Sequence, residues 1–497
     1  PCPVDSSADS NPTLEDGLSP YVPSETPTGG PWPLKVGTTE GGIVESGSLN
    51  GQTFSADSII NCPTQSNTCS ATYLDKTQVV LKATADPNYT FIGWNGASCA
   101  SEQICIVTMD KAWDVTARFA LSSSLSNLHQ QITVSGGSYH TCATDTVGAL
   151  YCWGRNNKGQ LGDGTTTDRS IPTAVKSSLA GSSLSGVKKV VGGSYSSCAI
   201  MNDKTLMCWG DNQYGQLGNG TTTSSSYPVQ VKDSTGTGVL SGVTDLAMGN
   251  GHTCARVSVS SGVSIQCWGL NSNGQLGNNS LTNRSLPSAV SGLSGASLLW
   301  VGENYSCAKL SSSFQCWGLN NYGQIGIGNT ATPQKTPQSV SSILAGSGIA
   351  SRFGSQNCAT DSNGSAYCWG LNGKGQLGNG DTSNSNVPIV PTGLTSGVLN
   401  LTGGYEFSCS LSTGGAAKCW GDNTYKQVGN ASVGSTSTTP AGVTGLSSGV
   451  ISISSGSYHS CAVLSGDLLR CWGRNNYNQL GDSTTVNQST PVLVDLP

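Results

Sequence analysis

The stretch CWGRNNKGQLG at residues 152–162 decides the fold, because close variants of it recur along the chain. Its opening triplet, Cys-Trp-Gly, occurs seven times in 497 residues, at intervals of 49 to 59 residues. A unit of about 50 residues that repeats in this way is typical of propellers. The triplets begin at Cys152, Cys208, Cys267, Cys316, Cys368, Cys419 and Cys471.

One further cysteine precedes each triplet, separated from it by a strand, a polar turn and a second strand. Cysteines that lie opposite each other in an antiparallel hairpin are close enough to bridge. We therefore predict one cross-strand disulfide per repeat, each contributing about 2–3 kcal/mol. The adjacent tryptophan then points to the other side of its strand, towards the neighbouring repeat. The pairs are Cys142/Cys152, Cys198/Cys208, Cys254/Cys267, Cys307/Cys316, Cys358/Cys368, Cys409/Cys419 and Cys461/Cys471.

Each repeat contains four short strands, the pattern of a propeller blade. They are a Pro-x-x-Val strand, an apolar run that ends in glycine, and the two cysteine-bearing strands. The first repeat starts near Ile132 without the proline strand, and a spare copy of that strand, residues 491–494, ends the chain. We expect this C-terminal strand to complete the first blade and so to remove the exposed sheet edges. The predicted fold class is all-β, a seven-bladed propeller.

Composition narrows the classes of partner. Charged residues make up only 10% of the chain, the net charge is −5, and no basic stripe is present, which argues against nucleic acid. The sequence contains no run of eighteen apolar residues, which is the length that a membrane-spanning helix needs. The nineteen cysteines include no Cys-x-x-Cys, so they favour structural disulfides over zinc or redox sites. Disulfides on this scale predict an exported, extracellular or cell-surface protein, and the start at Pro1 fits the removal of a leader.

Two further regions precede the propeller, which we place at residues 122–497. Residues 1–33 hold eight of the twenty prolines and are predicted to be an extended arm or linker. Residues 34–121 show strand-like alternation and form a small β-rich domain, with the predicted disulfides Cys62–Cys69 and Cys99–Cys105 as staples for a limited core. Cys2 is left unpaired, either as a free thiol or for an inter-chain bond through which the arm supports self-assembly.

The seven Trp-Gly-x-Asn segments, most of them followed by Gly-Gln-Leu-Gly, resemble the regulator of chromosome condensation repeat family over roughly residues 130–497. The resemblance implies a seven-bladed propeller. Nuclear members of that family exchange nucleotide on a small GTPase and bind chromatin, but they do not need a cysteine pair in every blade. The pairs therefore favour secreted bacterial relatives, among which one inhibits β-lactamases through a face of the ring.

The domain in front resembles a bacterial repeat of the internalin B-repeat type. The resemblance rests on Cys62 to Cys69, residues 79–86, the Phe-Ile-Gly-Trp segment at 91–94, Cys99 to Cys105, and residues 107–119. It implies a small, β-grasp-like spacer or adhesive module on an exported bacterial protein.

Catalytic motifs are missing from the sequence, so we predict no enzyme, no metal and no cofactor. Of the four histidines, His140, His252 and His459 occupy equivalent repeat positions, and packing explains them better than catalysis. One residue precedes each of the seven Gly-Gln-Leu-Gly-like segments, and together these seven residues should form a ring on one face of the propeller that suits protein or glycan contact. That ring is Lys158, Tyr214, Asn273, Tyr322, Lys374, Tyr425 and Tyr477.

Packing between blades is the alternative role for this ring. A second aromatic set precedes the first cysteine of five repeats: Tyr139, Tyr195, Tyr305, Phe407 and Tyr458. Taken together, the sequence predicts a secreted or cell-surface bacterial interaction protein that binds a protein or glycan through a propeller face, as a subunit of an extracellular assembly. The alternative is a secreted enzyme inhibitor that acts through loops of one face.

Overall fold

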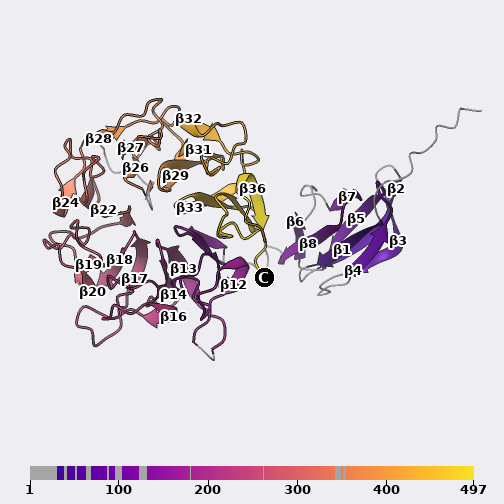
Figure 1. The fold of residues 1–497 in the computed structure, drawn as a ribbon, viewed down its shortest axis with the longest axis horizontal. Helices are drawn as coiled ribbons and strands as arrows, with labels where there is room; N and C mark the ends of the chain where they lie inside the picture. The colour runs from indigo at the N-terminus through magenta and orange to yellow at the C-terminus, as the bar shows by residue number, and fades with distance from the viewer. Residues whose placement is uncertain are drawn as a thin grey trace, which may run out of the picture. The chain divides into compact units, whose positions relative to one another are not determined.

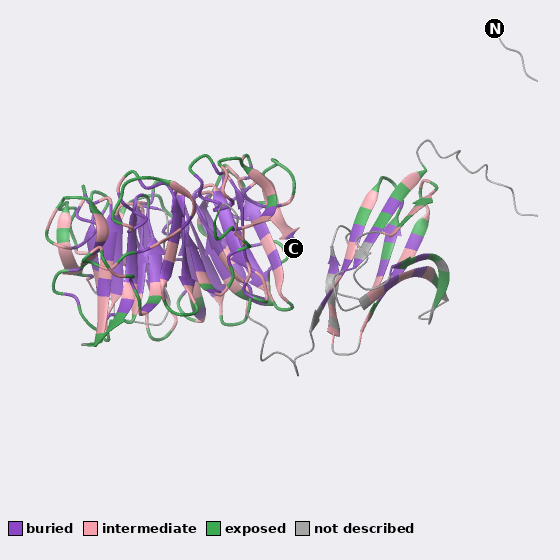
Figure 2. Ribbon diagram, turned by 90° about the horizontal axis from the view of Figure 1, so that it is seen from below, coloured by how far each residue is buried: buried purple, intermediate pink, exposed green. Residues whose placement is uncertain are grey.

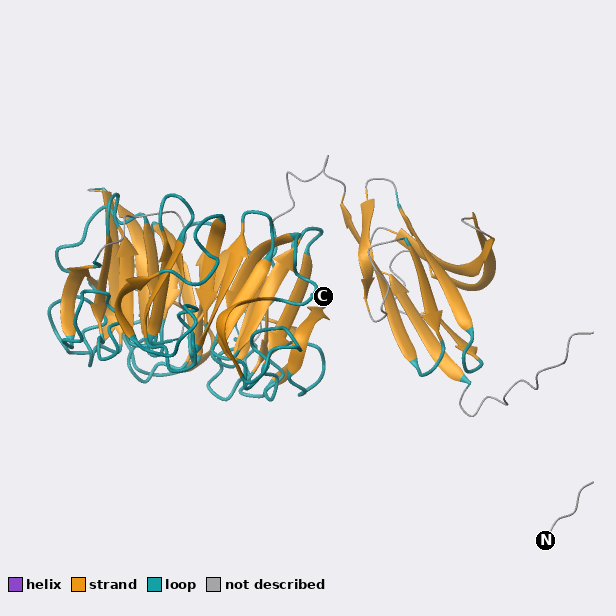
Figure 3. Ribbon diagram, turned by 90° about the horizontal axis from the view of Figure 1, so that it is seen from above, coloured by secondary structure: helices purple, strands orange, loops and turns teal. Residues whose placement is uncertain are grey.

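The computed structural model describes residues 31–38, 42–50, 53–62, 69–86, 89–95, 103–121, 131–178, 181–260, 262–341, 349–350 and 354–497. The described residues are all strand, turn and loop, without a helix (Figure 3). They belong to two compact units, Pro1–Ala120 and Leu121–Pro497. Cys2, Cys99, His129 and most of the predicted arm lie outside the described residues, so the proposed fate of the arm stays a prediction.

The described residues of the first unit form two four-stranded sheets, in the orders β4-β1-β8-β6 and β3-β2-β5-β7. Its first and last strands pair in parallel, with Leu34 opposite Trp113. The buried core includes Leu34, Val44, Leu81 and Val115. The strands are β1 (Trp32–Thr38), β2 (Gly42–Asn50), β3 (Thr53–Cys62), β4 (Cys69–Tyr73), β5 (Gln78–Ala85), β6 (Tyr89–Asn95), β7 (Ile104–Thr108) and β8 (Trp113–Leu121).

The predicted Cys62–Cys69 disulfide is present in this unit and joins the end of β3 to the start of β4. Because β3 and β4 belong to different sheets, this bond staples the two layers together. Cys105 is also disulfide-bonded, but its predicted partner Cys99 falls outside the described residues. The unit that we expected to be β-grasp-like is thus a pair of stapled sheets in its described part.

In the second unit, the part of the chain that the structure describes forms seven four-stranded sheets set around a ring (Figure 1). The first two blades are β9 (Thr133–Gly136), β10 (His140–Thr144), β11 (Leu150–Gly154) and β12 (Arg169–Ala174), then β13 (Val187–Gly192), β14 (Ser196–Met201), β15 (Leu206–Gly210) and β16 (Ser225–Gln230). The next two are β17 (Val243–Met248), β18 (His252–Val259), β19 (Gly262–Gly269) and β20 (Arg284–Ala289), then β21 (Leu298–Val301), β22 (Tyr305–Lys309), β23 (Phe314–Gly318) and β24 (Gln334–Ser339).

Blades five to seven continue the same order from the innermost strand to the outermost strand. They are β25 (Ile349–Ala350), β26 (Gln356–Thr360), β27 (Ala366–Gly370) and β28 (Ser385–Ile389); β29 (Val398–Gly403), β30 (Phe407–Ser412), β31 (Ala417–Asp422) and β32 (Thr436–Gly442); and β33 (Val450–Ser455), β34 (His459–Leu464), β35 (Leu468–Gly473) and β36 (Gln488–Val494). The predicted seven-bladed propeller is confirmed.

The predicted mode of ring closure is wrong. The C-terminal strand β36 pairs with β35, with Cys471 opposite Val492, so residues 491–494 complete the last blade and not the first. The first blade is complete without them, because β12 supplies its fourth strand. In every blade the proline strand therefore follows the Cys-Trp-Gly strand as the outermost strand. Proline suits that edge position because it has no N–H to offer a further strand.

The ring closes by side-chain packing between the last blade and the first. Ile132, Ala143 and Trp153 of the first blade share one buried cluster with Val463 and Leu480 of the last. The backbone contributes too, since Ser457 N donates to Gly137 O across the junction at 3.3 Å. Figure 2 shows that the inner strands of the propeller are largely buried, because neighbouring blades cover them on both sides, whereas the outermost strands are mostly half-exposed.

All seven predicted hairpin disulfides are present. In each blade the two cysteines are directly opposite in the register of the second and third strands, as Cys307 is to Cys316. Their Cα atoms lie 4.0–4.1 Å apart. This spacing matches the close, non-hydrogen-bonded pair of an antiparallel ladder, which is the geometry that a cross-strand bridge requires.

Removing one of these disulfides should cost stability without loss of the fold. We expect the Cys409→Ala/Cys419→Ala double variant to unfold with a free energy about 3 kcal/mol lower, since the bond closes a loop with a sequence separation of 10. Urea unfolding followed by tryptophan fluorescence measures this loss. The Cys461→Ala/Cys471→Ala pair, with the same separation, is the matched comparison and should cost the same. A loss well below 1 kcal/mol in both variants would contradict the structural role of the staples.

Candidate functional site

Each Cys-Trp-Gly tryptophan fixes its blade to the one before it. All seven indoles are fully buried. Each indole N–H donates to the backbone oxygen of the glutamine in the preceding blade's Gly-Gln-Leu-Gly-like segment, at 2.9–3.0 Å. The predicted packing of this tryptophan on the neighbouring repeat is confirmed. A glycine in that segment is needed as well: a Cβ at Gly481 would lie 2.6 Å from Trp153 Nε1.

The asparagine two positions after each Cys-Trp-Gly triplet organises the loop at one end of the blade. In the first blade, Asn156 is fully buried, and its Nδ2 donates to the carbonyls of Thr165 and Thr167 while its Oδ1 accepts from Leu161 N. Gln160 Oε1 then accepts from the backbone N–H of Lys158, at 2.8 Å. These contacts recur around the ring, so that equivalent loop residues are held in equivalent places at the same end of each blade.

The three repeated histidines are buried in the walls between blades. His140, His252 and His459 are 0–1% exposed. Each Nε2 pairs with a hydroxyl group of an adjacent blade: Ser197, Ser306 and Thr141 respectively, at 2.8–3.0 Å. Burial lowers the pKa of all three imidazoles to about 3, so they are neutral at pH 7. Their contacts are those of packing residues, as we predicted.

A cluster of tyrosine and arginine side chains lies at the end of the propeller where the innermost strands finish. Tyr139 is its centre, with ring centroids of Tyr195, Tyr458 and Tyr477 at 5.4–6.1 Å. Tyr405 and Tyr425 join through Tyr458, at 5.8 and 5.5 Å. We call these six tyrosines, together with Arg155 and Arg474, the tyrosine–arginine cluster.

The two arginines stack on these rings. Arg155 Cζ lies 4.5 Å from the Tyr477 centroid, and Arg474 Cζ lies 4.3 Å from that of Tyr425. Both side chains are only half-buried, and in the described part of the chain neither guanidinium has a carboxylate within salt-bridge distance. The cluster therefore presents aromatic surface and uncompensated positive charge together, over blades one, two, six and seven.

The structure brings only part of the predicted ring into this cluster. Tyr425 and Tyr477 belong to it, and each contacts the following blade. Lys158 lies 3.6 Å from Asp211 of the second blade, and Tyr214 packs beside Gly251 of the third. All seven positions are exposed or half-exposed. Contact with the next blade and access to solvent thus coexist at these positions.

The second aromatic set divides into two groups. Tyr139, Tyr195 and Tyr458 are half-exposed and belong to the cluster. Tyr305 and Phe407 are fully buried, because they lie one residue later, at the position that histidine occupies in three other blades. The sequence analysis missed Arg155 and Arg474. The available signal was the residue after each triplet, which reads Arg, Asp, Leu, Leu, Leu, Asp, Arg around the ring.

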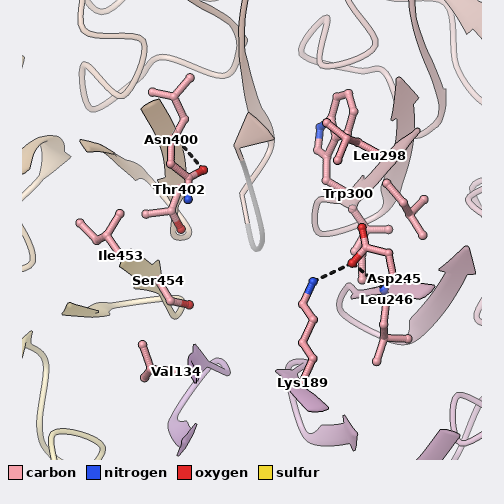
Figure 4. A pocket seen from close by; sticks show the side chains of 14 residues that line it. Val134, Lys189, Asp245, Leu246, Leu298, Trp300, Asn400, Thr402, Ile453 and Ser454 are labelled. Atoms are coloured by element: carbon pink, nitrogen blue, oxygen red, sulfur yellow. Dashed lines mark hydrogen bonds and ion pairs between the residues drawn. The ribbon is translucent and has the colours of Figure 1, made fainter. Parts of the chain in front are cut away.

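The central channel is lined by innermost strands and encloses a cavity of about 280 Å³. Figure 4 shows Lys189 of β13 paired with Asp245 of β17 at 2.6 Å, and Thr402 and Ser454 on another side. Since the lysine and aspartate compensate each other, the channel has no free charge at this pair. Among the described residues, no group of three potential metal ligands is present, and no helix is long and apolar enough to cross a membrane.

The fold and this site define a disulfide-stapled seven-bladed propeller with an aromatic, cationic surface at one end. The regulator of chromosome condensation (RCC1) repeat model matches residues 147–200, 205–256, 266–308, 363–411, 419–463 and 469–497, more than half of the chain. The chain belongs to this family, which is known for protein interaction and whose members are typically binding or regulatory proteins. A divergent InlB B-repeat domain matches residues 63–123, so both predicted resemblances are confirmed.

Similar proteins include the ultraviolet-B receptor UVR8 of Arabidopsis thaliana, 27% identical over 73% of this chain and 81% of the receptor. The human E3 ubiquitin-protein ligase HERC2 is 29% identical over 73% of this chain, but the match spans only 6% of the ligase. Among solved structures, human WBSCR16 superposes with a TM-score of 0.58 at 20% identity, over 70% of this chain and 94% of that one. Yeast RCC1 (Prp20), solved with Kap60, superposes with a TM-score of 0.56 at 19% identity, over 68% of this chain and 81% of that one. These structures share the fold.

Proposed function

We propose that this chain is an exported bacterial binding protein that captures a protein or glycan partner through the tyrosine–arginine cluster. The observation that carries the proposal is the pairing of six packed tyrosines with two half-exposed, uncompensated guanidinium groups. Tyrosine and arginine are the residues in which binding energy concentrates at protein interfaces, because they combine large contact area with directed polar groups. Tyrosine also presents this area at a low cost in conformational entropy.

The proposed location outside the cytosol rests on the staples. Eight disulfides join described cysteines, which suits an oxidising compartment and not a reducing one. The InlB B-repeat match in the first unit supports the bacterial surface in particular, as the place where the propeller meets its partner. Binding, and not catalysis, is the proposed activity, because the repeated histidines are enclosed in the core.

A capture experiment with a matched arginine control tests this function. The immobilised full chain is exposed to defined surface protein fractions and to a glycan array, and the species retained is identified and titrated. We expect Arg155→Ala/Arg474→Ala to weaken its binding at least 30-fold, since each arginine anchors two or more rings. Arg284→Ala changes an exposed arginine on the outermost strand β20 and should leave the affinity unchanged.

Equal affinity of the wild type and the double variant for the retained species would contradict the proposal. If that species is an enzyme, its activity in the presence of the chain separates simple capture from inhibition. A partner lost in the Arg284→Ala variant and kept in the double variant would instead place the binding surface on the outer edge of the ring.

A further inference from the structure

The innermost strands end around a small bowl of about 130 Å³, distinct from the cavity within the channel. Residues that directly follow these strands line it, because the chain turns there to begin the second strand of each blade. Four of the lining side chains are tyrosines of the cluster: Tyr139, Tyr195, Tyr405 and Tyr458. The other lining residues are Ser138, Ser194, Asn250, Glu303 and Ser457.

Among the described residues that line the bowl, Glu303 alone carries a formal charge. It is half-buried, and within the described residues no hydrogen bond or ion pair is found for its carboxylate. Burial raises the pKa of this carboxyl, which is the response of a carboxylate that has lost water and gained no cation. Arg155 and Arg474 do not line the bowl, although their guanidinium groups lie 5.1–5.7 Å from the ring centroids of Tyr139, Tyr195 and Tyr458, and neither forms an ion pair with Glu303. The negative charge of Glu303 therefore lacks a partner within the site.

The backbone holds Glu303 in place from both sides. Its N–H donates to Gly354 O of the fifth blade at 3.3 Å, and its carbonyl accepts from Asn250 N of the third blade at 3.1 Å. A carboxylate fixed in this way needs little reorganisation to meet a ligand. Burial, and after it the negative charge of Glu303, raises the pKa of the Tyr405 phenol, and both residues line the bowl, so the charge and the aromatic wall belong to one site.

We propose that this bowl binds an alkylammonium group, with Glu303 as counterion and the tyrosines as an aromatic cage. Aromatic rings attract cations that approach their faces, the ammonium of lysine among them, and aromatic cages recognise methylated lysine and other quaternary ammonium groups. A cavity of about 130 Å³ takes the end of one such chain and excludes a whole folded surface. Resting on the proposed function, this inference assigns to the captured partner an exposed lysine side chain that enters the bowl.

Matched small probes test the charge requirement on the intact chain. The probes are Nα-acetyl-lysine methylamide and its neutral counterpart, Nα-acetyl-norleucine methylamide, with tetramethylammonium as a third. Saturation-transfer NMR should show binding of the lysine probe at millimolar concentration and at least tenfold weaker binding of the norleucine probe. Glu303→Gln should weaken the lysine probe at least tenfold, and Tyr405→Ala should weaken it several-fold.

Glu406→Gln is the matched control. Glu406 is also half-buried at this end of the ring and its pKa is also raised by burial, but it does not line the bowl, so its variant should bind like the wild type. If tetramethylammonium binds more tightly than the lysine probe, the ligand of the bowl is a free quaternary ammonium compound and not a lysine side chain of a partner protein. The inference is overturned if neither cation binds, or if Glu303→Gln binds them as the wild type does.

The two proposals fail in distinguishable ways. If the chain captures its partner but binds neither cation probe, only the proposed ammonium site in the bowl is contradicted. If the chain binds the cation probes but Arg155→Ala/Arg474→Ala captures the partner as the wild type does, the proposed binding surface is contradicted and the proposed ammonium site stands.

Discussion

Replacing Trp153 by alanine should open the ring at its junction between the last blade and the first. The indole is fully buried there, and its N–H donates to Gln479 O at 3.0 Å. Truncating a buried tryptophan to alanine costs about 3–5 kcal/mol, through lost burial and the cavity that remains. Among the strands that the structure describes, none is exchanged at this junction, so the packing of side chains and a few hydrogen bonds carry the closure. Hydrogen exchange of the β9 and β35 amides measures the opening.

Trp317→Ala is the control for this prediction. Trp317 makes the same contact with Gln275 O at 3.0 Å, but between blades three and four, which the chain itself links. Both variants should lose a similar free energy of unfolding in urea. Faster exchange should appear across the first and last blades only in Trp153→Ala. Equal exchange at that junction in the two variants would show that closure does not depend on the indole.

Acid should destabilise the propeller through its three buried histidines. Their pKa is about 3 in the folded chain, against about 6.5 for an unfolded one. Below about pH 6.5 the three histidines take up protons in the unfolded chain but stay neutral in the folded chain. Stability that is present at neutral pH is therefore lost as the pH falls towards 3. The three together should lower the free energy of unfolding by about 4 kcal/mol for each pH unit between about pH 6 and pH 4.

The fifth blade supplies the natural replacement for this test. Gln356 occupies the histidine position there, and its Nε2 donates to Gly404 O and Phe407 O at 2.9 and 3.0 Å. The triple variant His140→Gln/His252→Gln/His459→Gln should therefore fold and lose most of the extra slope. Urea titrations at pH 7, 6, 5 and 4 compare the two chains, and acidic groups common to both cancel in the difference. Parallel slopes would contradict the assignment.

The sequence predicted what depends on pairing within one repeat. The Cys142–Cys152 type of bridge and the role of Trp153 both follow from strand alternation and short spacing, and both are found. The place of the proline strand was predicted wrongly, because the loop of residues 155–168 separates it from its own hairpin and leaves it next to the following apolar run. Spacing along the chain does not reveal which neighbour a strand pairs with after such a loop.

The site was predicted less completely because it depends on contacts between blades. Tyr477 was singled out, but its partners Tyr139 and Arg155 belong to the first blade, more than 300 residues earlier in the sequence. A shift of one residue relative to the first cysteine also separates the half-exposed Tyr139 from the buried Tyr305. The spacing shows the shift, but the register of β10 and β22 shows that it moves the side chain from the surface into the wall between blades.

The contiguity of each blade has a consequence for how this gene can change. Because four successive strands make every sheet of the propeller, a cut between two blades severs none of these sheets. A circular permutant that joins the present ends of the propeller and opens between β20 and β21 would keep all seven sheets whole. For the same reason, an in-frame duplication or loss of one repeat would add or remove one complete blade. The number of blades could therefore change in a single genetic step.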